Sequence, residues 1–80
     1  MNEDNINITI IAGSWARYFI PDETTRLKVK KNADIADALA LLNIPVDEIG
    51  LTVINGKAVP RDAALTDGDE IKIFPVISDG

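Results

Sequence analysis

One helix, bounded at both ends, divides the chain into two groups of extended segments, and no other feature restricts the fold as strongly. Asp34 followed by Asp37 has the pattern of a capping box, in which two side chains accept the free amides of the first helical turn. Asn43 tolerates the left-handed conformation that ends many helices, and Pro45 prevents the helix from resuming. We therefore predict a helix of about three turns. Its apolar face consists of Ile35, Leu39 and Leu42.

Alternating apolar and polar residues predict two strands before this helix and three after it. The apolar positions are rich in β-branched side chains, which favour extended structure. Asn55-Gly56 is a strong signal for a hairpin, and Asp67-Gly68 supplies the turn before the last strand. The predicted strands are residues 5–12, 24–30, 51–54, 57–59 and 70–75.

This order of elements predicts the fold class. A hairpin, a crossover helix and a second hairpin with a return strand form one mixed sheet of about five strands, with the helix packed on one face. The arrangement is an α+β fold of the β-grasp type. We expect the two most apolar strands, 5–12 and 70–75, to be parallel neighbours at the centre of the sheet. The basic strand 24–30 and the short strand 57–59 suit the edges.

Composition excludes several classes of function. A chain of 80 residues is enough for one domain, residues 1–80. Neither cysteine nor histidine occurs, which removes disulfides, zinc sites and the usual general base. The net charge of −5 disfavours binding to nucleic acid or to membrane surfaces. A polar N-terminus and the lack of a long apolar run predict a cytoplasmic protein.

The acidic residues do not predict a catalytic site. Most of them stand at helix caps and turns, where carboxylates accept local backbone amides, and no calcium-loop spacing occurs. A glycine loop of the kind that binds phosphate is also missing from the sequence. We therefore predict that the protein binds no cofactor or metal. We also predict that it is not an enzyme but is acted on by enzymes.

Two segments stand outside the regular pattern. The connection 13–23 contains the aromatic residues Trp15, Tyr18 and Phe19, which predicts a loop packed on the core. An exposed Trp15 would instead be typical of an anchor for a partner protein. After the last strand, Pro75 cannot donate to the sheet ladder, so we expect residues 76–80 to leave the sheet as a flexible tail.

Two apolar side chains are expected on the open face of the sheet, away from the helix. Alternation along the last strand places Phe74 on that face. The same count along strand 51–54, with Leu51 and Val53 facing the helix, places Ile54 beside it. An apolar pair on an open sheet face is typical of a surface that a partner binds.

Three motifs resemble the MoaD/ThiS family of ubiquitin-like sulfur carriers. They are Ile-Asn-Gly-Lys-Ala-Val-Pro at 54–60, Leu-Thr-Asp-Gly-Asp-Glu-Ile at 65–71, and Ile-Phe-Pro-Val at 73–76 with a glycine at the end of the chain. The resemblance extends from Ile6 to Gly80, and Trp15-Ala16-Arg17 is placed like the aromatic and basic segment of MoaD-type members. It implies that a ubiquitin-activating-type enzyme uses ATP to adenylate Gly80, which is then converted to a thiocarboxylate.

The chain departs from this family next to its last residue. Family members usually end in Gly-Gly, whereas Asp79 precedes Gly80 here. Glycine suits a chain end that must enter another protein's active site, because it has no Cβ. Asp79 adds bulk and a negative charge near the phosphates of ATP. This predicts reduced, altered or absent activity unless the natural chain continues by one more glycine.

The resemblance also implies partners and contact residues. The length and the loop after the first strand are MoaD-like, so the expected recipient of the sulfur is molybdopterin synthase, through its large subunit. Alternatives are a ThiS-type carrier for thiazole synthase, a TGS-like binding module, and a ubiquitin-like modifier joined to lysines through Gly80. The residues expected to contact partners are Phe74, Pro75, Val76, Ile77, Ser78, Ile54, Trp15 and Arg17.

Overall fold

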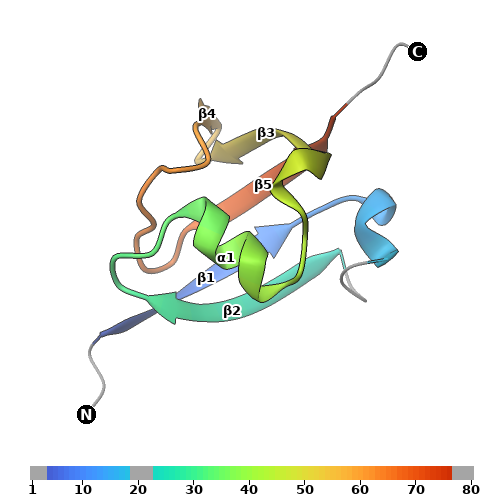
Figure 1. The fold of residues 1–80 in the computed structure, drawn as a ribbon. Coiled ribbons are helices and arrows are strands. Elements are labelled where there is room, and N and C mark those ends of the chain that lie inside the picture. Colours follow the sequence, from blue (N-terminus) through green and yellow to red (C-terminus); the bar gives the residue numbers. More distant parts are fainter. Residues whose placement is uncertain (1–3, 19–22, 77–80) are drawn as a thin grey trace.

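The computed structural model describes residues 4–18 and 23–76, and within them the chain forms one mixed sheet of five strands with a helix across one face (Figure 1). The predicted β-grasp fold is therefore confirmed. Two short 3-10 helices, η1 (Ser14–Tyr18) and η2 (Val46–Glu48), lie in the connections. The strands and the α-helix are β1 (Asn5–Ile11), β2 (Thr24–Lys30), α1 (Ile35–Leu41), β3 (Ile49–Ile54), β4 (Lys57–Val59) and β5 (Glu70–Pro75).

The strands are ordered β2-β1-β5-β3-β4 across the sheet. β1 and β5 are parallel neighbours at the centre, as predicted, and every other neighbouring pair is antiparallel. The basic strand β2 and the short strand β4 form the two edges, which is also as predicted. The last strand of the chain is thus the middle strand of the sheet.

α1 begins with the predicted capping box. Asp34 Oδ1 accepts the amide of Asp37 at 2.9 Å, and Asp37 Oδ2 accepts the amide of Asp34 at 3.1 Å. The helix is shorter than the predicted three turns, because it spans only seven residues. Asn43 takes the left-handed conformation, with φ 59°, and the chain turns back so that the amide of Ile44 binds the carbonyl of Leu39 at 3.0 Å. The predicted end of the helix at Asn43 is therefore confirmed.

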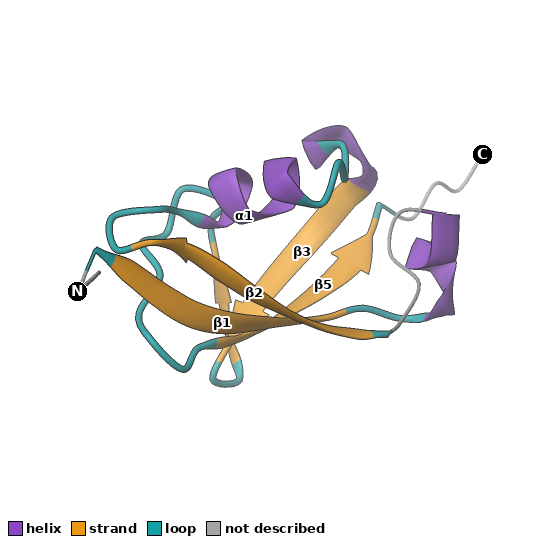
Figure 2. Ribbon diagram, turned by 90° about the horizontal axis from the view of Figure 1, so that it is seen from below, coloured by secondary structure: helices purple, strands orange, loops and turns teal. Residues whose placement is uncertain are grey.

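The core lies between α1 and the face of the sheet that α1 covers (Figure 2). Isoleucines of the two central strands dominate it, and they pack against the apolar face of the helix. Among the largest side chains that are fully buried are Ile8, Ile10, Ile35, Leu39, Ile71 and Ile73.

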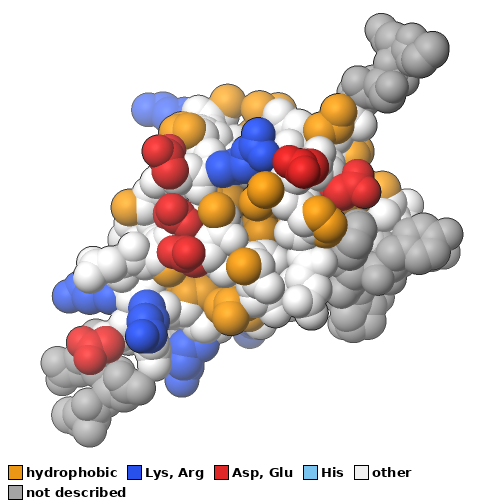
Figure 3. Space-filling view, viewed as in Figure 1, with side chains coloured by type: hydrophobic (Ala, Val, Ile, Leu, Met, Phe, Trp, Pro, Cys, Tyr) orange, Lys and Arg blue, Asp and Glu red, His pale blue; other side chains and the backbone are white. Residues whose placement is uncertain are grey.

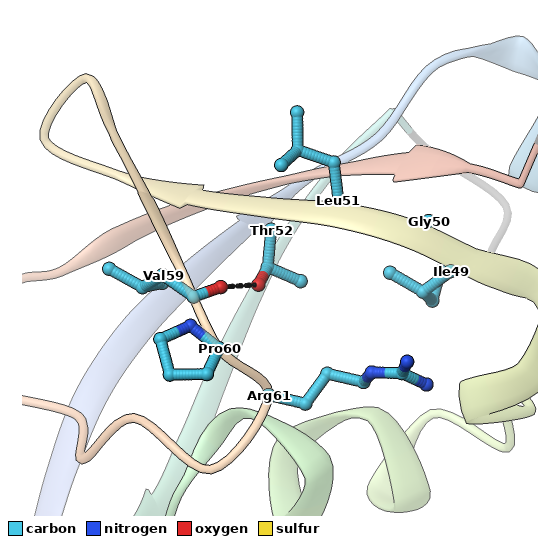
Figure 4. A pocket seen from close by; sticks show the side chains of 7 residues that line it. All are labelled: Ile49, Gly50, Leu51, Thr52, Val59, Pro60 and Arg61. Atoms are coloured by element: carbon cyan, nitrogen blue, oxygen red, sulfur yellow. Dashed lines mark hydrogen bonds between the residues drawn. The ribbon is translucent and has the colours of Figure 1, made fainter.

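The predicted position of Ile54 on the open face is wrong. Ile54 is only 9% exposed and belongs to the core, as does Thr52 at 3% exposure, while Leu51 points to the other face. The count failed because a polar residue occupies a core position: Thr52 Oγ1 donates a hydrogen bond to the carbonyl of Val59 at 2.6 Å. Figure 4 shows this bond, with Leu51 on the opposite side of the strand.

The acidic turn at 65–71 has a structural role. Asp67 Oδ1 accepts the amide of Asn7 at 2.8 Å, and Asp69 Oδ2 accepts the amide of Thr66 at 2.9 Å. The amide of Gly68 donates to the carbonyl of Asn7 at 2.7 Å, and Gly68 has φ +88°, which favours glycine. These bonds join the start of β5 to the start of β1. The predicted use of these carboxylates for local amides is confirmed for Asp69, whereas Asp67 binds an amide that is distant in the sequence.

The topology predicts the pattern of amide exchange. Amides of Ile8, Ile10 and Ile71 should exchange slowest, because the central strands open only when the whole domain unfolds. The amides of β2 that point away from the sheet should exchange fast, because local fluctuations of the edge are enough to expose them. Hydrogen exchange followed by NMR measures both sets. Slower exchange along β2 than along β1 would contradict the strand order.

No helix in the described part of the chain is long and apolar enough to cross a membrane.

Candidate functional site

An apolar surface lies where β5 ends. Phe74 is 43% exposed and is paired across the strands with Leu51, which is 44% exposed. Val76, two residues after Phe74, is 53% exposed. Alternation along β5 directs Phe74 and Val76 away from α1, and Leu51 of β3 lies on the same face as its pair Phe74. We call these three side chains the open-face patch (Leu51, Phe74 and Val76). Exposed apolar side chains gathered in this way are typical of a protein-binding surface.

The loop after β1 borders this patch. A hollow of about 310 Å³ lies between the end of β1 and the end of β5, and Trp15, Phe74 and Pro75 line it. Trp15 is half-buried and packs against the core, so its predicted packing is confirmed, while the side chain of Tyr18 and all of Phe19 lie outside the described residues. Gly13 allows the indole to fold back, because a Cβ there would stand 3.0 Å from Trp15 Cδ1. Both ribbon views place η1 at the end of the sheet where β5 finishes (Figures 1 and 2).

The chain is held one residue beyond the predicted end of pairing. Pro75 pairs with Ile49, and the amide of Val76 then donates to the carbonyl of Glu48 at 3.0 Å. Val76, which we predicted to belong to the tail, is therefore tied to the sheet through its backbone. Pro75 has no amide hydrogen to donate to the ladder. The next residue, Val76, does donate one, because η2 places the carbonyl of Glu48 within reach.

Gly50 provides the space for this attachment. The register between β3 and β5 shifts between Ile49 and Leu51, and at Gly50 the two chains come unusually close. A Cβ there would stand 2.9 Å from the carbonyl oxygen of Pro75 and 3.0 Å from Cα of Val76. Both contacts are to backbone atoms, so a side chain at this position could be accommodated only if the backbone of Pro75 and Val76 moved.

We expect Gly50→Ala to disturb the end of β5. The added methyl group must push Pro75 and Val76 away, and overpacking of this kind costs roughly 1–3 kcal/mol. Urea unfolding measures the loss of stability, and the NMR shift of the Val76 amide reports its hydrogen bond to Glu48. Leu51→Ala is the control, because it removes exposed atoms from the next residue. An unchanged Val76 amide in Gly50→Ala would show that the close contact is unimportant.

A second hollow lies on the other side of β3. Its volume is about 260 Å³, and Gly50, Thr52, Val59 and Arg61 are among the residues that line it (Figure 4). Arg61 Nη1 donates to the carbonyl of Val46 at 2.8 Å, and Thr52 is bound to Val59. These polar groups hold η2 and the end of β4 in place. We assign this hollow a structural role.

The structure brings together four of the predicted contact residues, Trp15, Phe74, Pro75 and Val76, at one end of the sheet. It separates Ile54 from them, because that side chain is in the core. Leu51 was missed, because the polar Thr52 beside it indicated that Leu51 faces the core. The predicted site residues Ile77, Ser78, Asp79 and Gly80, and the side chain of Arg17, lie outside the described residues.

Comparison with known protein families identifies the fold more closely. The model of the family described as Mut7-C ubiquitin matches residues 17–79. The chain belongs to the Mut7-C ubiquitin family. This membership confirms the ubiquitin-like identity that the sequence motifs implied. A comparison with curated proteins gives no match.

Solved structures agree with the Mut7-C ubiquitin assignment. SAMP1 from Haloferax volcanii is 25% identical, with a TM-score of 0.70 over 92% of this chain and 99% of that one. The HVO 2177 protein from Haloferax volcanii is 17% identical, with a TM-score of 0.80 over 100% of this chain and 92% of that one. A Pyrococcus furiosus protein assigned as molybdopterin converting factor, subunit 1, is 16% identical, with a TM-score of 0.73 over 90% of this chain and 99% of that one. The last two likenesses show the shared fold.

Proposed function

We propose that this Mut7-C ubiquitin protein is a sulfur carrier whose Gly80 carboxylate is adenylated and then converted to a thiocarboxylate. The observation that supports the proposal most directly is the course of β5. This central strand carries the chain past the open-face patch and is held at Val76 by the carbonyl of Glu48. A partner that binds the patch therefore contacts the chain at Val76, which precedes Gly80 by four positions in the sequence.

The proposed chemistry occurs in the partner's active site. A carboxylate oxygen of Gly80 attacks the α-phosphorus of ATP, and pyrophosphate leaves. Sulfide then attacks the carbonyl carbon of the acyl-adenylate, and AMP leaves with the electron pair of the broken C–O bond. This protein supplies the carboxylate and the docking surface, while ATP binds to the activating enzyme, which is of the ubiquitin-activating type.

We further propose that the sulfur is used in molybdopterin synthesis, by the large subunit of molybdopterin synthase. The structural likeness to the Pyrococcus furiosus protein, whose description names molybdopterin converting factor, supports this choice. The exposed patch beside Trp15 offers the large subunit an apolar surface to bind. Transfer to thiazole synthase is the alternative outcome within the same chemistry.

A second candidate function is that of a protein modifier. The likeness to SAMP1 supports it, because related structures from Haloferax volcanii are described as small archaeal modifier protein 1. In this case an amine, rather than sulfide, attacks the activated Gly80. The two functions share the adenylation step and differ only in the attacking atom.

One experiment tests both. The protein is incubated with a ubiquitin-activating-type enzyme of the source organism, ATP and sodium sulfide, and its intact mass is measured. A mass gain equal to the exchange of one oxygen for sulfur supports the carrier. Higher-mass bands on a gel, with Gly80 joined to lysine in the peptide map, support the modifier. If neither AMP nor sulfur becomes attached to Gly80, both proposals fail.

We expect Phe74→Ala to weaken binding to the activating enzyme by about tenfold or more. Burying a large apolar side chain contributes roughly 1.5–3 kcal/mol, and each 1.4 kcal/mol corresponds to about tenfold in affinity. Isothermal titration calorimetry with the enzyme measures the change. Leu41→Ala is the matched control, because Leu41 is 59% exposed on the opposite side of the sheet. Equal affinities for Phe74→Ala and the wild type would remove Phe74 from the docking surface.

A further inference from the structure

The outer side of β2 carries backbone groups that no other strand in residues 4–18 and 23–76 pairs with. The amide of Lys31 donates to the backbone carbonyl of Asp4 at 2.6 Å, and the amide of Ala12 donates to the backbone carbonyl of Glu23 at 2.8 Å. Hydrogen-bonded pairs alternate along an antiparallel ladder. Residues 23, 25, 27, 29 and 31 therefore bond toward β1, and residues 24, 26, 28 and 30 direct their backbone groups outward. The carbonyl of Lys30 is used by Ala33 at 2.9 Å, which ends the open edge.

A groove lies beside the end of this edge, at Val29 and Lys30, on the helix side of the sheet. Its volume is about 470 Å³, and Val29, Ala33, Ala40 and Leu41 form its apolar wall, with Lys30 and Asp37 also lining it. Leu41 is 59% exposed, although it belongs to the only α-helix in the described part of the chain. The space-filling view shows apolar atoms between α1 and β2, with Lys and Arg side chains along the adjoining edge (Figure 3).

The other face of β2 is basic. Arg26, Lys28 and Lys30 are exposed there, while Leu27 and Val29 alternate with them and pack toward the core. The whole chain has a net charge of −5, so this strand is a local concentration of positive charge in an acidic protein. Surface charges on an edge strand protect it from pairing with other edges. Protection of the edge from pairing does not require an apolar groove on the opposite face, so the groove indicates a further role.

We propose that the β2 edge binds an extended segment of a partner protein in which acidic and apolar residues alternate. An added strand would bond to the outward backbone groups of residues 24–30, which is the mode of strand addition. Its side chains would alternate between the two faces. Those on the helix side would lie beside Leu27 and enter the apolar groove at Val29, and those opposite Arg26, Lys28 and Lys30 would meet positive charge. The two faces of β2 thus select the two residue types at alternating positions.

A second copy of this chain fits the edge poorly. Pairing two β2 strands would bring Arg26, Lys28 and Lys30 of one copy against the same basic residues of the other. Like charges directly opposite one another on neighbouring strands destabilise the pair. The charge of β2 therefore favours an acidic partner over self-association.

The test uses the full chain and a synthetic seven-residue peptide of sequence Asp-Val-Glu-Ile-Asp-Val-Glu. Titration followed by NMR should shift the amides of 24–30 and 33–41 and leave those of the open-face patch unchanged. A peptide of the same composition with its acidic and apolar residues in separate blocks should bind at least tenfold more weakly. No shifts at millimolar peptide, or shifts centred on the open-face patch, would overturn the proposal.

Protein variants separate the two faces of the edge. Lys28→Glu should weaken peptide binding by about tenfold or more, because it replaces attraction by repulsion, while Lys57→Glu on β4 should have little effect. Leu41→Ala should weaken binding several-fold, and Phe74→Ala should leave it unchanged. Equal effects of Lys28→Glu and Lys57→Glu would show that the peptide is attracted only by the overall charge of the protein, and would overturn the proposed site on β2.

Two N-methylated peptides test the backbone pairing itself. One carries methyl groups on the amides of its central acidic residues, and the other on its central apolar residues. Only one of these sets can face β2, so one peptide should lose binding and the other should keep it. Loss with the acidic set indicates an antiparallel added strand, and loss with the apolar set a parallel one. An equal response to both, or a dimer of the free protein paired through β2, would overturn strand addition.

Discussion

Removal of Gly80 is expected to abolish adenylation and sulfur transfer. The proposed function requires a terminal carboxylate on a residue without Cβ. The shortened chain would end in Asp79, whose side chain brings a second negative charge to the reacting group. Intact mass after incubation with the activating enzyme, ATP and sulfide measures the loss. Binding to the enzyme measured without ATP serves as the control, since the open-face patch is unchanged in this variant.

Changes at Asp79 should act in the opposite direction. Asp79→Gly is expected to raise the rate of adenylation, because it removes both Cβ and a charge near the phosphates of ATP. Two unit charges about 4 Å apart interact by roughly 1 kcal/mol in water and about 4 kcal/mol near a protein surface. Asp79→Asn should recover part of the gain, since it removes the charge and keeps the bulk. A rate for Asp79→Asn no higher than that of the wild type would show that charge is not the limiting factor.

Ile71→Ala is expected to leave the protein largely unfolded at moderate temperature. Ile71 is fully buried in β5 and is paired with Ile10 on one side and Ile54 on the other. Truncating a buried isoleucine to alanine costs about 2–5 kcal/mol. A chain of this length has a total stability of roughly 4–12 kcal/mol at the usual value per residue, so the loss takes much of it. Thermal unfolding followed by circular dichroism measures the effect.

Lys72→Ala is the matched control for this core variant. Lys72 is the next residue on the same strand, it is exposed, and surface substitutions of this kind usually change stability by no more than about 0.5 kcal/mol. If both variants unfold at the same temperature as the wild type, the central position of β5 would be in doubt.

Much of the fold could be predicted because its signals are local. The capping box at Asp34 and Asp37, the left-handed Asn43 and the hairpin at Asn55-Gly56 each depend on a few neighbouring residues. The order of the strands followed from which segments are apolar and which are basic. In these places propensity and tertiary packing agree.

The errors occurred where a local pattern competed with a contact distant in sequence. Thr52 is polar, but its hydroxyl is hydrogen bonded to the carbonyl of Val59, so it can occupy a core position. Ile54 therefore also faces the core, and Leu51 faces the open side of the sheet, which is the reverse of the prediction. The close approach of Gly50 to Val76 depends on a carbonyl that η2 supplies. The groove beside β2 depends on where α1 lies over the sheet. None of these contacts is encoded within a single stretch of the sequence.

The parallel pairing of β1 with β5 also affects how the protein is made. Asn7 and Asp67 are hydrogen bonded although they are 60 residues apart in sequence, and folds dominated by such distant pairings form slowly. During synthesis β1 and β2 leave the ribosome first but have no central partner until residues 70–75 emerge. A chain that terminates early lacks this strand and has no closed core. Synthesis of β5 is therefore required for folding, and only a chain that includes β5 presents the surface that the activating enzyme is proposed to bind.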